Sequence, residues 1–261
     1  MKRNIKLVVA VLLVTLAGCA NMGQGPTGGK MDTTAPSFQK SSPENGSSNI
    51  RPGKIEILFN EYLQINDPTQ NLVVSPPQKP NVSAKVIGKK LVVEFKDTLK
   101  ENATYTLDFN NCIGDYTENN LISNFCYTFS TGNEIDSMVL SGLLLDAETL
   151  QPVPNVLVGI YSQEEDSTFK TTPFERIGRT DAGGHFSIKG AAEKSYKIFA
   201  LEDLNGNYFY DQESEGIAMQ ESPLPIPTKT IITKQDTIFK DSVTIDTIIT
   251  RKTFCYKPDS I

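Results

Sequence analysis

Short segments of alternating polar and apolar residues, separated by turn-forming residues, occupy much of this chain. In the segment 54–63, KIEILFNEYL, the apolar Ile55, Ile57 and Phe59 occupy every second position. Successive side chains of a β-strand point to opposite faces, so a period of two predicts a strand with one buried face. A chain built from such segments folds by pairing them into sheets, and we therefore predict an all-β fold of antiparallel strands.

Further strand segments follow at short intervals. They lie at 71–77, 82–99, 104–110 and 125–132, bounded by Gly, Pro and Asn. Gly88 and Lys89 interrupt the second of these segments, which predicts a tight hairpin at that point. Short strands at this spacing, with turn residues between them, are typical of a β-sandwich.

Three motifs in this region carry a resemblance. They are DTTAPSFQKSSPENGSSNI at 32–50, LKENATYTLDF at 99–109 and FCYTFSTG at 125–132. Together they resemble the bacterial Ig-like domain of the surface-layer-protein type, over a domain at 35–133. The resemblance implies a sandwich in which Ser42-Pro43 and Asn45-Gly46 form the turn after the first strand. It also implies a module that mostly acts as a spacer or in adhesion.

A second strand-rich region covers 136–220. It contains LSGLLLDAETLQPVPNVLVGIY at 140–161 and GRTDAGGHFSIKG at 178–190. These motifs resemble a carboxypeptidase-regulatory-like or transthyretin-like (prealbumin-like) β-sandwich. The predicted fold is thus two consecutive antiparallel β-sandwiches.

The N-terminus predicts export and a lipid anchor. Lys2, Arg3 and Lys6 precede an apolar stretch at 7–16, which is too short to span a membrane as a helix and indicates a signal peptide. The sequence Leu-Ala-Gly-Cys that ends at Cys19 resembles the bacterial lipobox, which implies cleavage after residue 18 and acylation of the Cys19 thiol. Several acyl chains are enough to hold a protein on a membrane.

The Gly-rich segment 19–34 would then be a flexible tether. No Asp follows Cys19, which in such lipoproteins favours the outer membrane over the inner one. The predicted location is the outer membrane, and both its periplasmic and its outer face stay open. Removing residues 1–18 changes the net charge from −6 to −9, because they carry three basic residues and no acidic one. So acidic a protein repels phosphate backbones, which excludes nucleic acid as a partner.

The segment DLNGNYFYDQESEG at 203–216 is the candidate metal site. Calcium prefers six to eight oxygen ligands, and oxygen-bearing side chains alternate along this stretch. We take the candidate calcium ligands to be Asp203, Asn205, Asn207, Asp211 and Glu215. Tyr208 stands where similar calcium loops carry Gly, and an ordinary Asn-Gly turn is the alternative.

Three cysteines remain besides Cys19. Cys112 and Cys126 flank one predicted connection, so a disulfide could close it in an exported protein, and two small buried apolar side chains are the alternative. Without a Cys-x-x-Cys pair, a zinc cluster is not expected. His185 is the single histidine, and we assign it no catalytic role.

Asp followed by Ser or Thr and a further suitable residue recurs along the chain. This pattern resembles the three-residue O-glycosylation acceptor of one Gram-negative phylum. The candidate acceptors are Thr33, Thr237, Ser242 and Thr247. They lie in the tether and in the segment 221–261, which begins Pro-rich and continues as an unpaired, strand-like tail. Because that alternation runs to the last residue, we expect the natural chain to be longer.

No catalytic motif emerges from the sequence. The predicted function is therefore a non-enzymatic, lipid-anchored envelope protein with a structural, spacer or adhesive role. Its partners would be the membrane, through the lipid, and an envelope protein or a glycan. The alternative is a carbohydrate-binding or processing accessory component whose catalytic part lies outside this chain.

Overall fold

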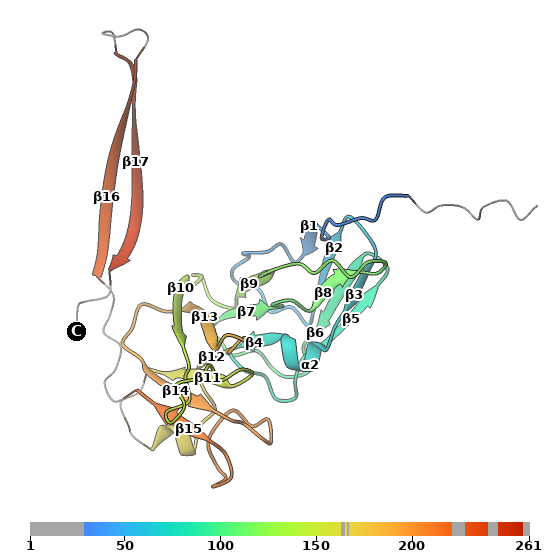
Figure 1. Cartoon of the computed structure of the whole chain (residues 1–261), viewed down its shortest axis with the longest axis vertical. Coiled ribbons are helices and arrows are strands. Elements are labelled where there is room, and N and C mark those ends of the chain that lie inside the picture. The colour runs from blue at the N-terminus through green and yellow to red at the C-terminus, as the bar shows by residue number, and fades with distance from the viewer. Residues whose placement is uncertain (1–28, 163–164, 166, 221–227, 240–244, 258–261) are drawn as a thin grey trace, which may run out of the picture. The chain divides into compact units, whose positions relative to one another are not determined.

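The computed structural model describes residues 29–162, 165, 167–220, 228–239 and 245–257, the last two ranges by their backbone only. The described helices and strands all belong to one unit of the chain, which begins at Thr34. These elements are almost entirely β-strands (Figure 1), apart from the short helix α2 (Pro68–Asn71) and the 3-10 helix η1 (Thr168–Lys170). Among the described residues, no helix has the length and apolar character that crossing a membrane requires.

The first strand set comprises nine strands. They are β1 (Phe38–Ser42), β2 (Lys54–Phe59), β3 (Leu63–Ile65), β4 (Val73–Ser75), β5 (Ser83–Ile87), β6 (Lys90–Glu94), β7 (Thr104–Asp108), β8 (Ile113–Asp115) and β9 (Cys126–Ser130). They form antiparallel sheets in the orders β1-β2-β6-β5, β4-β7-β9 and β3-β8.

The alternating apolar residues of β2 contribute to the core of the first strand set. Ile55, Ile57 and Phe59 are buried, as the period of two predicts. They join one apolar cluster with Tyr105 and Phe129, whose rings stack with their centroids 5.1 Å apart. Each such side chain contributes about 1.5–3 kcal/mol by leaving water, so this cluster is the main source of stability in the set.

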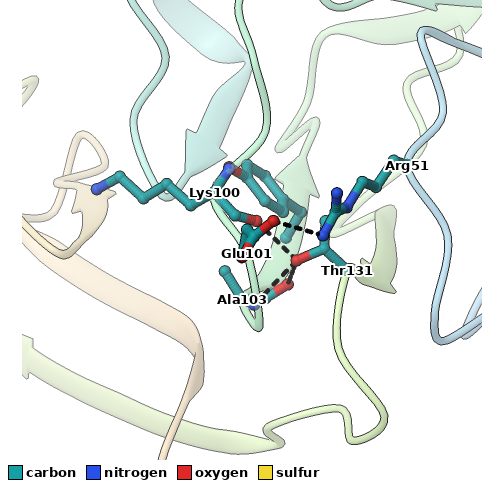
Figure 2. A network of polar contacts seen from close by, with 6 residues as sticks. Arg51, Lys100, Glu101, Ala103 and Thr131 are labelled. Carbon is teal, nitrogen blue, oxygen red and sulfur yellow. Dashed lines mark hydrogen bonds and ion pairs between the residues drawn. The ribbon is translucent and has the colours of Figure 1, made fainter.

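Two turns stabilise the connections between strands in this set. Gly88, with φ of 64°, connects β5 to β6 and allows the tight hairpin that the sequence predicts. Before β7, the Thr131 hydroxyl donates to the carbonyl of Lys100 over 2.7 Å and accepts from the Ala103 amide over 3.0 Å (Figure 2). The exposed pair of Arg51 and Glu101, 3.0 Å apart, lies beside this turn.

The second strand set follows in the chain. It comprises β10 (Met138–Leu143), β11 (Leu157–Tyr161), β12 (Arg176–Arg179), β13 (His185–Ala191), β14 (Lys197–Leu201) and β15 (Ile217–Met219). Its antiparallel sheets have the orders β10-β13 and β12-β11-β14-β15.

Strand β11 lies between two apolar clusters. Val158 and Ile160 belong to one cluster, and Leu157 and Tyr161 belong to the other. All five residues of β11 are buried, so this central strand is covered on both faces. The multiple antiparallel sheets and the near absence of helix confirm the predicted all-β fold class.

The two last described strands differ from the prediction. β16 (Thr228–Phe239) and β17 (Ile245–Lys257) pair antiparallel with each other, from Thr228 opposite Lys257 to Phe239 opposite Ile245. The prediction of an unpaired tail is wrong there, because the two halves of the segment act as each other's partner.

Candidate functional sites

The predicted calcium loop connects β14 to β15. The Asp203 carboxylate accepts hydrogen bonds from three backbone amides, those of Gly206 (2.8 Å), Asn207 (3.2 Å) and Tyr208 (3.0 Å). These bonds close the turn around Asp203. Its oxygens therefore already have partners from the protein itself.

The other predicted ligands belong to the same network. Asn205 donates from its side-chain amide to the Asp211 carboxylate over 2.9 Å, and Asn207 accepts from the Phe209 amide over 3.0 Å. The buried Glu215 carboxylate accepts from the amides of Leu204 and Asp211. Within the ranges that the structure describes, no three His, Cys, Asp or Glu residues gather so as to hold a metal ion. Calcium binding therefore stays a prediction.

Tyr208 adopts the backbone conformation that favours glycine. Its φ is 68°, and its hydroxyl donates to the Asn81 side chain over 2.7 Å, which anchors the strained residue to the first strand set. Burial raises the pKa of the Tyr208 hydroxyl, so the group stays protonated and donates at neutral pH. A non-glycine residue at this position is thus compatible with the turn.

We expect calcium to raise the melting temperature of the second strand set if it binds this loop. A calcium concentration a hundredfold above the dissociation constant stabilises the folded state by about 2.7 kcal/mol. Magnesium should substitute poorly, because it requires a stricter octahedral geometry. The measurement is thermal unfolding in millimolar calcium and in chelator, for the wild type, for Asp203→Asn and for Asp203→Ala combined with Asp211→Ala. Identical wild-type curves in calcium and in chelator would identify an ordinary Asn-Gly turn.

The predicted disulfide is not formed in this structure. Cys112 and Cys126 are both free cysteines. Cys112 lies fully buried in the apolar cluster of the first strand set, and burial raises the pKa of its thiol to about 12. The Cys126 sulfur instead lies 3.9 Å from the Thr128 hydroxyl oxygen. Cys112 therefore packs as a small apolar side chain, which is the alternative that the sequence left open.

The structure describes only some of the other predicted site residues. Cys19, Ser242 and the segment 221–227 lie outside the described residues, and Thr237 and Thr247 lie in the two strands that are described by their backbone only. Thr33 is exposed, which makes it an accessible O-glycosylation candidate that an intact-mass measurement would test. His185 is exposed at the start of β13, where its backbone amide donates to the Asp181 carboxylate over 2.9 Å.

Asp115 is a carboxylate that the sequence did not single out. It accepts from the four successive amides of residues 117–120, over 2.6–3.3 Å. Burial alone would raise its pKa, but these four donors together lower the pKa of Asp115 to about 2. The group is thus ionised at neutral pH and fixes the turn after β8.

Arg176 joins the two strand sets by its side chain. Its guanidinium is buried and donates to the carbonyls of Thr104 (2.6 Å), Ser75 (3.2 Å) and Lys189 (3.0 Å), and to the Thr106 hydroxyl (3.2 Å). Burial lowers the pKa of Arg176 to about 10, so the side chain still carries its charge at neutral pH.

Further polar contacts surround this guanidinium. The Ile177 amide donates to the Ser75 hydroxyl over 3.0 Å, and Lys189 pairs with Asp108 over 2.5 Å. In the connection between the strand sets, Thr104 donates from its hydroxyl to the Asp136 carboxylate over 3.0 Å. We call this group of contacts the Arg176 clasp. It fixes β7 of the first strand set against β12 and β13 of the second.

Two grooves lie where residues of both strand sets meet. One, of about 840 Å³, is lined by polar side chains that include Asn110, Asn124 and His185. The other, of about 830 Å³, is lined by residues near the start of β5, by residues of β12 and by the loop after β14. Sequence reasoning missed both grooves, because each is made by residues about 100 positions apart.

One comparison with known proteins places a similarity in the N-terminal region. The family model of the bacterial Ig-like domain matches residues 32–131, which confirms the resemblance of the motifs there. The segment 136–220 lies outside this match, so its resemblance to a carboxypeptidase-regulatory-like sandwich stays a prediction. A search of curated proteins returned no match.

Two solved structures are similar to this chain at low identity. The N-terminal part of the bacterial S-layer protein SbsC has 13% identity and a TM-score of 0.25, covering 72% of this chain and 45% of that one. The T6 backbone pilin of serotype M6 Streptococcus pyogenes has 10% identity and a TM-score of 0.22, covering 92% and 72%. The chain thus spans less than half of the S-layer structure. The family match covers less than half of the chain, and it shows that residues 32–131 are similar to the bacterial Ig-like domain.

Proposed function

We propose that this protein is a non-enzymatic, lipid-anchored component of the cell envelope, with a structural or spacer role. The observation that carries the proposal is the sequence around Cys19: a basic start, a short apolar stretch and a lipobox-like ending. The bacterial Ig-like domain that follows supports an envelope location, since such domains occur in surface and envelope structural proteins.

The Arg176 clasp supports the spacer role. A spacer has to transmit position from one end to the other, and this requires neighbouring modules that do not move independently. Most contacts between domains of one chain leave them free to move. Here a buried guanidinium with four acceptors, together with the pair of Lys189 and Asp108, joins the two strand sets.

The proposal makes two specific claims, that Cys19 is acylated and that the protein is attached to the outer membrane. We expect Cys19→Ala to abolish incorporation of labelled palmitate and to release the protein from outer-membrane fractions, because the acylated thiol is its membrane attachment. The measurement is label in the purified protein, together with its distribution between membrane and soluble fractions.

Cys126→Ala is the matched control, since it also removes one thiol but should keep the label. Palmitate that persists in Cys19→Ala would contradict the anchor. Wild-type protein that carries the label but fractionates with the inner membrane would contradict only the outer-membrane location.

A further inference from the structure

The chain contains two Asn-Gly pairs, Asn45-Gly46 and Asn205-Gly206. In such a pair the backbone nitrogen of the glycine can attack Cγ of the asparagine, because glycine has no Cβ to hinder the approach. A C–N bond forms, and the side-chain nitrogen leaves as ammonia together with the proton of the backbone amide. Water then opens the resulting succinimide and gives aspartate or isoaspartate. The reaction consumes only water, and it replaces a neutral amide by a carboxylate.

The two pairs have several properties in common. Asn45 and Asn205 are both exposed. Gly46 has a φ of 85° and Gly206 a φ of 69°, so both glycines adopt the left-handed conformation. No atom lies within 4 Å of the place where a methyl group would stand on either glycine. Exposure, backbone conformation and free space around the glycine therefore do not distinguish the two pairs.

The first pair is held by a strand of the core. The side-chain oxygen of Asn45 accepts from the Thr128 amide over 2.8 Å, and the Gly46 amide donates to the Thr128 carbonyl, also over 2.8 Å. Thr128 lies in β9. The preceding residue of that strand, Tyr127, belongs to the apolar cluster of the first strand set, and its hydroxyl donates to the Pro43 carbonyl over 2.9 Å. Freeing the nitrogen of Gly46 thus requires the whole turn to detach from β9.

The second pair is held only by its own loop. The Gly206 amide donates to the Asp203 carboxylate over 2.8 Å. The Asn205 side chain accepts from the Asn207 amide over 3.0 Å and donates to the Asp211 carboxylate over 2.9 Å. All these partners lie in the connection between β14 and β15, so their hydrogen bonds can open without breaking a strand pairing. Such a local opening costs less free energy than the release of a segment from a core strand.

We propose that Asn205 is a site of spontaneous deamidation in the folded protein and that the same reaction is suppressed at Asn45. The modification removes the amide that donates to Asp211 and places a second carboxylate beside that of Asp211. Like charges at this distance repel each other, so the modified loop loses a bond that closes it and gains a repulsion. The inference depends neither on the lipid anchor nor on calcium.

The test is incubation of the full-length chain in water labelled with heavy oxygen, followed by digestion and mass spectrometry of the two peptides that contain the pairs. The label marks deamidation that occurs during the incubation. We expect Asn205 to react roughly tenfold faster than Asn45 or more, because its glycine is released by a local opening. The rate should rise with pH, since hydroxide removes the proton of the attacking amide. In urea both pairs should react at similar rates, because the protection of Asn45 is lost on unfolding.

Three variants show whether the hydrogen bonds of the loop set the rate. Asp203→Ala removes the acceptor of the Gly206 amide, and Asp211→Ala removes the acceptor of the Asn205 amide. Each should accelerate the reaction at Asn205 severalfold and leave Asn45 unchanged, which also reports that the first strand set stays folded. Asn205→Ser is the matched control and should give no label in that peptide.

The proposal is overturned if the two asparagines react at equal rates in the folded protein or if Asn45 reacts first. It is equally overturned if Asn205 stays unlabelled in the folded chain while the chain in urea takes up the label. A reaction at Asn205 that is as fast in the wild type as in both aspartate variants would show that these hydrogen bonds do not restrain the glycine nitrogen, which also contradicts the proposal.

Discussion

Arg176→Met should lower the free energy of unfolding by about 3 kcal/mol or more. The substitution keeps an unbranched side chain but removes the guanidinium that donates to the carbonyls of Ser75 and Thr104 and to the Thr106 hydroxyl. All three acceptors belong to buried residues. A hydrogen bond to a charged group contributes about 1.5–3 kcal/mol, and an orphaned buried acceptor adds to the loss. For a chain of this size, the melting temperature should fall by roughly 6–12 °C.

The same substitution should separate the unfolding of the two strand sets. Calorimetry of the wild type should show one main transition for residues 34–220, and Arg176→Met should show two. Arg51→Met is the matched control, because Arg51 forms an exposed ion pair with Glu101 and such pairs contribute about 0–1 kcal/mol. A single transition at the wild-type temperature in Arg176→Met would show that the clasp does not couple the two sets.

Gly159→Ala should destabilise the second strand set by about 3 kcal/mol, at the upper end of what overpacking costs. A methyl group at Gly159 would lie 2.1–2.4 Å from three ring carbons of Phe174. Phe174 is 1% exposed and packs on Tyr161, with the ring centroids 5.1 Å apart. The ring therefore cannot move aside without leaving the core, and thermal unfolding should report a fall of roughly 6–12 °C.

Two further variants show whether the ring is the cause. Combining Gly159→Ala with Phe174→Leu should cost less than the two single changes added together, because the smaller side chain makes room for the methyl group. Gly53→Ala is the matched control, since no atom lies within 4 Å of a methyl group there. An equal loss of stability in Gly53→Ala would place the effect in the backbone instead of in the packing.

The sequence predicts well those features that neighbouring residues determine, and poorly those that depend on contacts between distant residues. The strand at Ile55–Phe59 and the hairpin at Gly88 follow from residues next to one another, and both are confirmed. In β7, Thr104 and Thr106 alternate with Tyr105 and Leu107, which predicts one solvated face. The structure instead buries all five residues of β7.

The reason is that the second strand set covers the polar face of β7. There Thr104 and Thr106 accept hydrogen bonds from Arg176. Nothing in the sequence of β12 indicates that this arginine is buried. In the predicted calcium loop, by contrast, the sequence predicts which residues come together but not what they bind. The sequence correctly groups Asp203, Asn205 and Asp211 in one turn, but oxygen spacing alone cannot tell backbone amides from a cation as their partner.

The clasp also bears on the order in which the molecule can assemble. The acceptors of Arg176 in the first strand set, at Ser75, Thr104 and Thr106, precede it by 101, 72 and 70 residues. During synthesis from the N-terminus, β4 and β7 are therefore complete long before their donor exists. Contacts between such distant positions form slowly, because a long loop has to close first. Until β12 is made, the face of β7 that carries Thr104 and Thr106 lacks its cover, and hydroxyl side chains can be hydrated there whereas aliphatic ones could not.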